Sequence, residues 1–291
     1  MRGIGPPLAT PFEESGSIDE ERLRELVHWV EERGVDFIVP CGSNSEAELM
    51  TSTERSRVIE IVTETTETPV LAGAGHPGYY ETIESIEAAA DAGADAALVV
   101  TPFYYNHGQD VLEEYFLEVA DASPLPVYLY SVPVFTGVRL EPETIGRLSE
   151  HPNIVGLKDS HADLGEFVRT QHAVDDPLFT MFIGSANVLT QALELGADGG
   201  ILALANVAPE ACAKMYRNHE VHPGRARSLN TEFVELNTAV TAHFGIPGLK
   251  HAMRARGAPA GHPRSPHRPP DDGAIAALDE ILEELELVSS A

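Results

Sequence analysis

The stretch Ile154-Val155-Gly156-Leu157-Lys158-Asp159-Ser160 decides how the rest of the chain is interpreted. Branched apolar residues and a glycine run directly into a lysine, and the sequence then becomes polar. This pattern predicts a short buried strand that ends in one ammonium group. Burial lowers the pKa of a lysine and makes its amine a nucleophile toward carbonyl carbon. The stretch alone leaves two interpretations open: a Schiff-base lysine, or a lysine that points into water.

Lysine is rare in this chain, which has only Lys158, Lys214 and Lys250. The other two lysines lie in helical patterns, where long cationic side chains usually keep their charged ends in water. We therefore expect Lys214 and Lys250 to occupy solvated surface positions.

Length and composition limit the class of protein. The chain has 291 residues, 43% of them hydrophobic, and single barrel domains of about 250 residues are common. No apolar run is long enough to span a bilayer, and the N-terminus lacks the apolar region of a secretion signal. The two cysteines, Cys41 and Cys212, are too few for a disulfide framework or a zinc site. We expect a cytoplasmic protein with no membrane partner and no metal.

Charge is the strongest signal in the composition. The chain has 46 acidic and 19 basic residues, and its formal net charge is −27. Such a surface repels nucleic acid, so no nucleic-acid partner is expected. The acids are spread over predicted helix faces and lysine is nearly absent, which is typical of proteins adapted to high salt, where screening relieves self-repulsion. The charge leads to the hypothesis of a halophilic enzyme.

Strand and helix patterns alternate along the first two thirds of the chain. The predicted strands are Gly3–Ala9, Phe37–Pro40, Val70–Ala74, Ala96–Thr101, Pro126–Tyr130, Ile154–Lys158, Phe179–Gly184 and Gly199–Ala203. The predicted helices are Asp19–Arg33, Thr53–Thr65, Thr82–Ala92, Val111–Ala120, Pro142–Ser149, Leu164–His172 and Val188–Leu195. This alternation favours an α/β protein whose parallel strands close into a (β/α)8 TIM barrel. An open doubly wound sheet is disfavoured, since no Gly-x-Gly-x-x-Gly follows the first strand.

Only helical patterns follow Val207. These helices are predicted at Pro209–Arg217, Pro223–Ala242, Pro247–Arg256 and Gly273–Leu287. The segment Gly257–Asp272 is rich in Pro, His, Gly and Arg and predicts a solvated connecting loop, whose His262 and His267 have no metal-ligand spacing. We divide the chain into a barrel with the active site, residues 1–207, and a C-terminal helical extension, residues 208–291.

The active sites of TIM barrels lie at the carboxyl ends of the strands. The predicted strands bring a defined set of residues there: Ser43, Asn44, Tyr104, Tyr105, Tyr130, Lys158, Gly184, Ser185 and Ile201. A lysine can form an imine with a keto group, a phenol can carry protons to and from the carbinolamine, and a serine can relay them. Each tyrosine taken alone is more often a packing residue, so this interpretation depends on their shared position.

Three motifs in this set resemble a known family. They are Gly42-Ser43-Asn44-Ser45-Glu46, Tyr130-Ser131-Val132-Pro133 and Gly156-Leu157-Lys158-Asp159. Their order and spacing are similar to those of the dihydrodipicolinate synthase / N-acetylneuraminate lyase family of class I aldolases, and the resemblance covers essentially the whole chain. It implies a TIM barrel with a C-terminal helical extension, usually a homotetramer built as a dimer of dimers. It also implies that no cofactor is needed, because the lysine is the electron sink.

The resemblance assigns roles to individual residues. It makes Lys158 the Schiff-base lysine and Tyr130 the proton-transfer phenol. Ser43 and Asn44 match a pair that binds the carboxylate of a 2-keto acid, and Ser43 is also expected to act in catalysis. Tyr104 matches a tyrosine donated across a dimer interface into the proton relay of the neighbouring subunit. Further substrate contacts are expected from Gly184, Ser185, Ile201 and Phe135.

Two departures from the family pattern narrow the function. In the pattern that the synthases resemble, the position of Phe135 holds an arginine that binds a second carboxylate. A phenyl ring cannot bind a carboxylate. This argues against a dihydrodipicolinate synthase. Gly-Ser-Asn-Ser-Glu replaces Gly-Thr-Thr-Gly-Glu, so Asn44 lacks the hydroxyl of a proton relay. Ser45 replaces a glycine and is expected to crowd the turn.

The resemblance and its departures together imply a Schiff-base lyase that cleaves a 2-keto-3-deoxy sugar acid to pyruvate and an aldehyde. The closest match in kind is archaeal 2-keto-3-deoxygluconate aldolase, with the 6-phosphate as an additional candidate substrate. Alternatives with the same imine are a keto-deoxy sugar-acid dehydratase, N-acetylneuraminate lyase and, disfavoured by Phe135, dihydrodipicolinate synthase. A barrel that binds a metabolite as a regulator without catalysis is disfavoured by the presence of both Lys158 and Tyr130, although Asn44 keeps it open.

Overall fold

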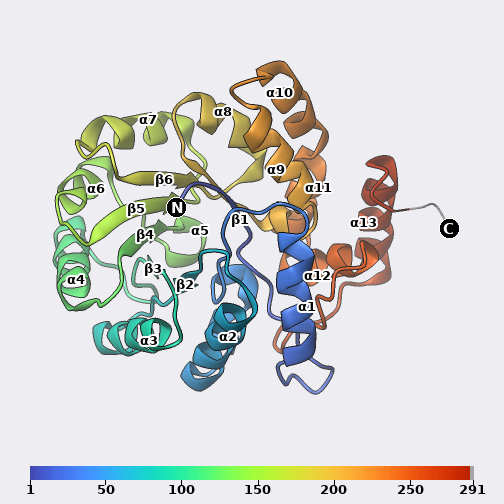
Figure 1. The fold of residues 1–291 in the computed structure, drawn as a ribbon, viewed down its shortest axis with the longest axis horizontal. Coiled ribbons are helices and arrows are strands. Elements are labelled where there is room, and N and C mark those ends of the chain that lie inside the picture. Colours follow the sequence, from blue (N-terminus) through green and yellow to red (C-terminus); the bar gives the residue numbers. More distant parts are fainter. Residues whose placement is uncertain (289–291) are drawn as a thin grey trace.

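Short parallel strands alternate with helices around one centre (Figure 1). The structure, a computed structural model, describes residues 1–288. The strands are β1 (Gly3–Gly5), β2 (Leu71–Gly73), β3 (Ala96–Val100), β4 (Val127–Ser131), β5 (Ile154–Asp159), β6 (Thr180–Ile183) and β7 (Gly199–Ile201). They form a parallel sheet in the order β1-β7-β6-β5-β4-β3-β2. The predicted α/β architecture is therefore confirmed.

The predicted second strand joins the two edges of this sheet. Residues 37–40 do not form a regular strand, but Val39 makes a parallel bridge with Pro7, and Ile38 makes one with Val70. The segment thus lies between β1 and β2 and closes the ring in a TIM-barrel-like fold. It is short because it ends in a proline, which has no N–H to donate to a ladder, and because the next residue, Cys41, turns the chain with φ 57°.

Helices surround the ring and continue beyond it. Those that follow the strands are α1 (Glu20–Glu31), α2 (Ser52–Thr65), α3 (Tyr79–Asp91), α4 (Gln109–Ala122), α5 (Pro133–Thr136), α6 (Pro142–Ser149), α7 (Leu164–Ala173), α8 (Leu189–Glu194) and α9 (Pro209–Asn218). Local signals define their ends. Thr51, for example, accepts a hydrogen bond from the Glu54 amide, while the Glu54 carboxylate accepts one from the Thr51 amide, and this capping box starts α2.

Side chains alternate between two cores along each strand, as the pleat requires. An inner cluster fills the ring and contains Phe37, Val39, Leu71, Ala96, Leu98, Tyr128, Tyr130, Val132, Phe182 and Ile201. A larger outer cluster lies between the ring and the helices and includes Ala97 and Val99 of β3. Gly156 shows how tight the inner packing is, since an added Cβ would lie 2.5 Å from the Tyr128 ring. The barrel interior is therefore a packed core, with Tyr130 at its upper end.

The C-terminal helices are α10 (Pro223–Glu232), α11 (Val234–Thr238), α12 (Gly245–Ala255) and α13 (Asp272–Glu284). The prediction of one helix over Pro223–Ala242 is wrong, because the helix breaks at Phe233 and continues as α11 and a π-helical turn, Ala239–His243. The chain division at residue 208 remains a prediction. Helix α9, which that division assigns to the extension, packs against β1 and α8 and so covers the barrel.

The expected surface position of Lys250 is wrong, whereas Lys214 is exposed as expected. The Lys250 side chain is 0% exposed and forms an ion pair with the equally buried Glu46. The loop 257–271 is likewise less solvated than expected, because its His267 also bonds to Glu46. Helical periodicity places a lysine on a face of its helix, but it does not reveal a carboxylate that approaches from a distant part of the chain.

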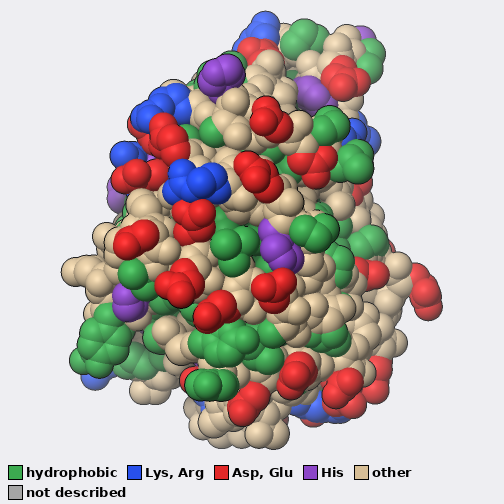
Figure 2. Space-filling view, turned by 90° about the vertical axis from the view of Figure 1, so that its left-hand side faces the viewer, with side chains coloured by type: hydrophobic (Ala, Val, Ile, Leu, Met, Phe, Trp, Pro, Cys, Tyr) green, Lys and Arg blue, Asp and Glu red, His purple; other side chains and the backbone are tan. Residues whose placement is uncertain are grey.

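Acidic side chains are scattered over the face on the left of Figure 1, with few basic ones among them (Figure 2). Several of the basic residues are arginines paired with carboxylates, such as Arg147 with Glu113 and Arg169 with Glu143. Within residues 1–288, no helix is both long enough and apolar enough to cross a membrane.

Candidate active site

Lys158 and Tyr130 lie side by side on neighbouring strands. Strand β5 places Lys158 opposite Tyr130 of β4 in the parallel register, and both side chains are buried. The Lys158 Nζ lies 4.1 Å from the centre of the Tyr130 ring. The predicted buried strand is therefore found, although it continues one residue beyond Lys158 to Asp159, and the ammonium group lies against a phenol rather than in water.

The surroundings of Tyr130 change its acidity. Burial has the largest single effect and would raise the pKa of Tyr130, because it penalises the phenolate. The Lys158 ammonium and the hydroxyls of Ser43 and Ser160 act in the opposite direction, and together they lower the pKa of Tyr130 below the ordinary value of 10.0. A phenol with a depressed pKa exchanges protons more readily near neutral pH.

The turn after residues 37–40 brings Ser43 to the phenol. Its hydroxyl lies 3.4 Å from the Tyr130 hydroxyl, at the long end of hydrogen-bond distances. The expectation that Ser45 crowds this turn is wrong. Its hydroxyl donates to the carbonyl of Leu8 and accepts from the amide of Gly42, so it fixes the 3₁₀ turn Ser43–Ser45 in place.

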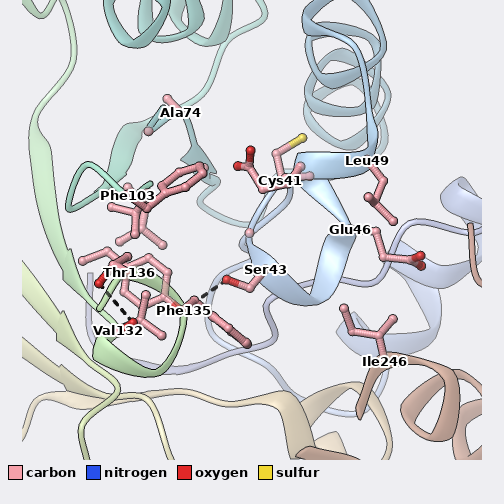
Figure 3. A pocket seen from close by; sticks show the side chains of 18 of the residues that line it. Cys41, Ser43, Glu46, Leu49, Ala74, Phe103, Val132, Phe135, Thr136 and Ile246 are labelled. Carbon is pink, nitrogen blue, oxygen red and sulfur yellow. Dashed lines mark hydrogen bonds between the residues drawn. The ribbon is translucent and has the colours of Figure 1, made fainter. Parts of the chain in front are cut away.

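A cavity of about 310 Å³ opens above this group. Figure 3 shows Phe103 and Val132 on one side, Leu49 and Glu46 on the other, and Ile246 approaching from the C-terminal helices. The remaining lining residues are Cys41, Gly42, Ser43, Ala47, Glu48, Gly73, Ala74, Gly75, Leu98, Val100, Tyr130, Phe135, Thr136 and His267. The cavity wall is mostly apolar and contains Glu46 and Glu48 but neither lysine nor arginine. Tyr130 lines it, whereas Lys158 does not.

The structure brings only part of the predicted set to this cavity. Ser43, Tyr130 and Phe135 line it, and Phe135 is 67% exposed at its mouth. Asn44, Ser185 and Ile201 do not line it, and Ile201 belongs to the inner barrel core.

Gly184 packs against Ser160, where an added Cβ would lie 1.9 Å from the Ser160 hydroxyl. Gly184 is therefore a close-packed position that does not line the cavity.

Tyr104 also lies away from the cavity. It is 86% exposed, and its φ of 77° is unusual for a non-glycine residue. Its edge-to-face contact with Tyr105, with ring centres 5.0 Å apart, leaves both rings on the surface.

Several residues near the site could not be predicted from strand ends alone. Ser160 influences Tyr130 from beyond the end of β5. Ile246 and His267 reach the cavity from the C-terminal part of the chain. No local sequence pattern indicated that either of these two residues faces the cavity.

Metal ligands are not grouped at this site. In the described part of the chain, no three His, Cys, Asp or Glu side chains are arranged to hold a metal ion. Burial raises the pKa of the Cys41 thiol to about 12, so Cys41 lines the cavity as a neutral side chain.

A TIM-barrel-like fold that places a buried lysine beside a phenol at the carboxyl ends of adjacent strands has the groups that Schiff-base chemistry uses. The chain belongs to the dihydrodipicolinate synthetase family, whose model matches residues 1–285. This confirms the family expected from the three motifs, and it makes the protein an enzyme of the class I aldolase type.

Known relatives match along nearly the whole chain. A 4-hydroxy-tetrahydrodipicolinate synthase of Methanothrix thermoacetophila is 37% identical over 97% of this chain and 96% of its own length. An uncharacterized DapA-like lyase of Halobacterium salinarum is 36% identical over 99% of this chain and 95% of its own length. Among solved structures, the prophage protein YagE of E. coli in complex with pyruvate is 30% identical, with a TM-score of 0.94 over 99% of both chains.

Proposed function

We propose that this enzyme cleaves a 2-keto-3-deoxy sugar acid, with 2-keto-3-deoxygluconate as the first candidate, to pyruvate and an aldehyde. The observation that carries the proposal is the pairing of Lys158 with Tyr130, which lines a cavity that has no lysine or arginine in its wall. A keto acid with one carboxylate and a neutral tail suits such a cavity better than a substrate with two anionic groups, since an unpaired anion is costly to bury. The unphosphorylated acid is favoured over its 6-phosphate for the same reason.

In the proposed mechanism, the Lys158 amine attacks the C2 carbonyl of the substrate and water is lost to give an imine. The C3–C4 bond then breaks, its electrons move into the imine, and Tyr130 takes the proton of the C4 hydroxyl as the aldehyde forms. Protonation of the resulting enamine at C3 and hydrolysis release pyruvate and restore the lysine. The lowered pKa of Tyr130 supports its role as the proton acceptor. Ser43 is proposed to relay protons to and from Tyr130.

The remaining predicted residues enter as proposals. Asn44, Gly184, Ser185 and Ile201 are proposed substrate contacts that a closed or liganded state would have to bring closer. Tyr104 is proposed to enter the site of a neighbouring subunit, which its exposed side chain supports. This requires an oligomer, and we propose a homotetramer. We also propose that the enzyme is cytoplasmic, adapted to high salt and part of carbohydrate metabolism. The grounds are its low cysteine content, its net charge of −27 and the family resemblance.

A second candidate, 4-hydroxy-tetrahydrodipicolinate synthase, is favoured by the name of the relative from Methanothrix thermoacetophila. Phe135 opposes it, because it lines the cavity where a cation would be needed for a second carboxylate.

The experiment that separates the candidates compares kcat/KM of the purified enzyme in two reactions. These are cleavage of 2-keto-3-deoxygluconate and condensation of pyruvate with aspartate semialdehyde. The proposal expects pyruvate and glyceraldehyde from the first reaction and weak activity in the second. Loss of water without pyruvate would identify a dehydratase, and efficient condensation would identify the synthase. N-acetylneuraminate belongs in the same panel, and cleavage of it alone would identify the lyase of that name.

A further inference from the structure

A buried ion pair connects the turn beside the active site to helix α12. The Glu46 Oε1 lies 2.5 Å from the Lys250 Nζ, and both side chains are 0% exposed. The ammonium group also donates to the carbonyl of Thr10, at 2.7 Å, and to that of His262, at 2.8 Å. The ammonium group is thus surrounded by one carboxylate and two carbonyl acceptors, and such pairing is the condition under which a buried cation is tolerated.

The other carboxylate oxygen of Glu46 is held as well. Its Oε2 accepts a hydrogen bond from the Arg264 amide at 2.8 Å and one from His267 Nδ1 at 3.0 Å. Arg264 and His267 belong to the loop between α12 and α13. Both oxygens of one carboxylate are therefore bound by the C-terminal part of the chain, although Glu46 itself follows the predicted second strand.

The backbone of Glu46 ties this network to Ser43. Glu46 has φ 58° and ψ 36°, a left-handed conformation that is unusual for a residue with a Cβ and persists only where surrounding contacts enforce it. Its amide donates to the carbonyl of Ser43 at 3.1 Å. This bond closes the turn that brings the Ser43 hydroxyl to Tyr130.

A buried ion pair of this kind is not required for net stability. Replacing a buried ion pair by apolar side chains is often neutral or stabilising, so the pair is weak evidence for stability and better suited to fixing one arrangement of the chain. Here the arrangement that it fixes is the turn that carries Ser43.

We propose that Glu46 is a positioning residue that acts through Ser43, with Lys250 as the anchor that holds it. The C-terminal part of the chain then helps to shape the active site, because α12 and the loop after it keep the Ser43 hydroxyl within reach of Tyr130. The inference rests on the proposed role of Tyr130 and Ser43 in proton transfer, but not on which sugar acid is cleaved.

The test measures the rate of imine formation with pyruvate alone, by rapid quenching with borohydride and mass spectrometry. This reaction needs no second substrate, so a wrong sugar-acid assignment leaves the measurement intact, whereas a wild type that forms no imine would contradict the proposed function itself. The variants are Glu46→Gln with Lys250→Met, which removes both charges together, and Ser43→Ala, each alone and combined. The matched control is the exposed pair Glu143→Gln with Arg169→Met, whose side chains are 62% and 56% exposed.

We expect the Glu46/Lys250 double variant to form the imine roughly ten- to a hundredfold more slowly than wild type, the size of effect that small misplacements of catalytic groups produce. Ser43→Ala should slow the wild type by a similar factor but slow the double variant by much less, because the hydroxyl is already misplaced there. The control pair should leave the rate unchanged. An equal effect of Ser43→Ala in both backgrounds, or an unchanged rate in the double variant, would overturn the proposal.

A milder change keeps the test valid if the double variant does not fold. His267→Ala removes one donor from the Glu46 carboxylate at a side chain that is 35% exposed, and leaves the buried pair intact. The proposal expects slower imine formation and a reduced effect of Ser43→Ala in this background too. Full additivity between His267→Ala and Ser43→Ala, or no effect of His267→Ala on the rate, counts against it.

Discussion

The Lys158 ammonium group lies 4.1 Å from the centre of the Tyr130 ring, and the two residues are register partners on β5 and β4. Parallel pairing fixes this relationship, because it aligns the carboxyl ends of both strands at one end of the barrel. The proposed nucleophile and the proposed proton carrier are thus placed by the sheet itself.

The first prediction concerns the nucleophile. Reduction with borohydride in the presence of pyruvate should add a pyruvate-derived mass to the peptide that contains Lys158, and Lys158→Met should abolish both the adduct and turnover. Peptide mass spectrometry makes the measurement, and the exposed Lys214 and buried Lys250 serve as internal controls. An adduct on either of these lysines, or none in the wild type, would contradict the mechanism.

The second prediction concerns the phenol. Tyr130→Phe should lower kcat by about a hundredfold or more, the usual contribution of a general acid–base group, while the pyruvate adduct on Lys158 can still be trapped after long incubation. Because the pKa of Tyr130 lies below its ordinary value, the wild-type rate should depend on pH below the usual tyrosine range, and this dependence should vanish in the variant.

The matched control for that variant is Tyr128→Phe. Tyr128 lies on the same strand and in the same inner core, but its hydroxyl accepts from the N-terminal amine at 3.0 Å and does not line the cavity. Its loss should leave kcat within a few-fold of wild type. Equal losses in both variants would point to damaged packing rather than to proton transfer.

The third prediction concerns Phe135 at the cavity mouth. Phe135→Arg should weaken cleavage of 2-keto-3-deoxygluconate, because it adds a large cation to a wall that has none, and should raise condensation with aspartate semialdehyde. The measurement is kcat/KM for both reactions, with Phe135→Leu as an apolar control that should alter neither by more than a few-fold. Unchanged values for Phe135→Arg would show that the ring only packs against its loop.

The fourth prediction concerns stability in acid. Burial, reinforced by the Arg55 charge, lowers the pKa of His76 from 6.5 to about 4. The unfolded chain therefore binds a proton that the folded protein does not, and stability should fall as the pH drops from 6.5 toward 4. The loss from this residue should be about 2 to 3 kcal/mol.

Urea unfolding at both ends of that pH range tests this directly. His76→Gln cannot take up the proton, so the variant should lose less stability than wild type between the two pH values. The exposed His172→Gln is the control and should lose as much as wild type. Equal losses for wild type and His76→Gln would show that His76 is not a source of the acid sensitivity.

The fifth prediction concerns salt. At a net charge of −27, with acidic side chains scattered over the face shown in Figure 2, self-repulsion should destabilise the fold at low ionic strength. The Tm should rise as KCl is increased into the molar range. A calorimetric series in KCl makes the measurement, and a Tm that does not move would remove the argument for salt adaptation.

Much of this protein could be predicted from local sequence patterns. The alternation of strands and helices, the buried strand that carries Lys158, and the position of Tyr130 near the end of its strand all follow from short-range periodicity. Strand ends also identified Ser43 correctly as a neighbour of the phenol. These features are local because a strand or helix pattern extends over only a few residues on either side of the position it describes.

Other features were decided only by the tertiary structure. The helical pattern around Lys250 predicts a surface residue. In the structure, Lys250 is buried against Glu46, which comes from the other end of the chain. The cavity wall likewise combines Leu49, Phe103 and Ile246 from three separate segments. The sequence by itself determined which chemical groups are present and at which strand ends they lie. Which charges are desolvated, and which side chains share a cavity, depends on contacts between segments that no local pattern encodes, because burial and pairing exist only once the chain has closed on itself.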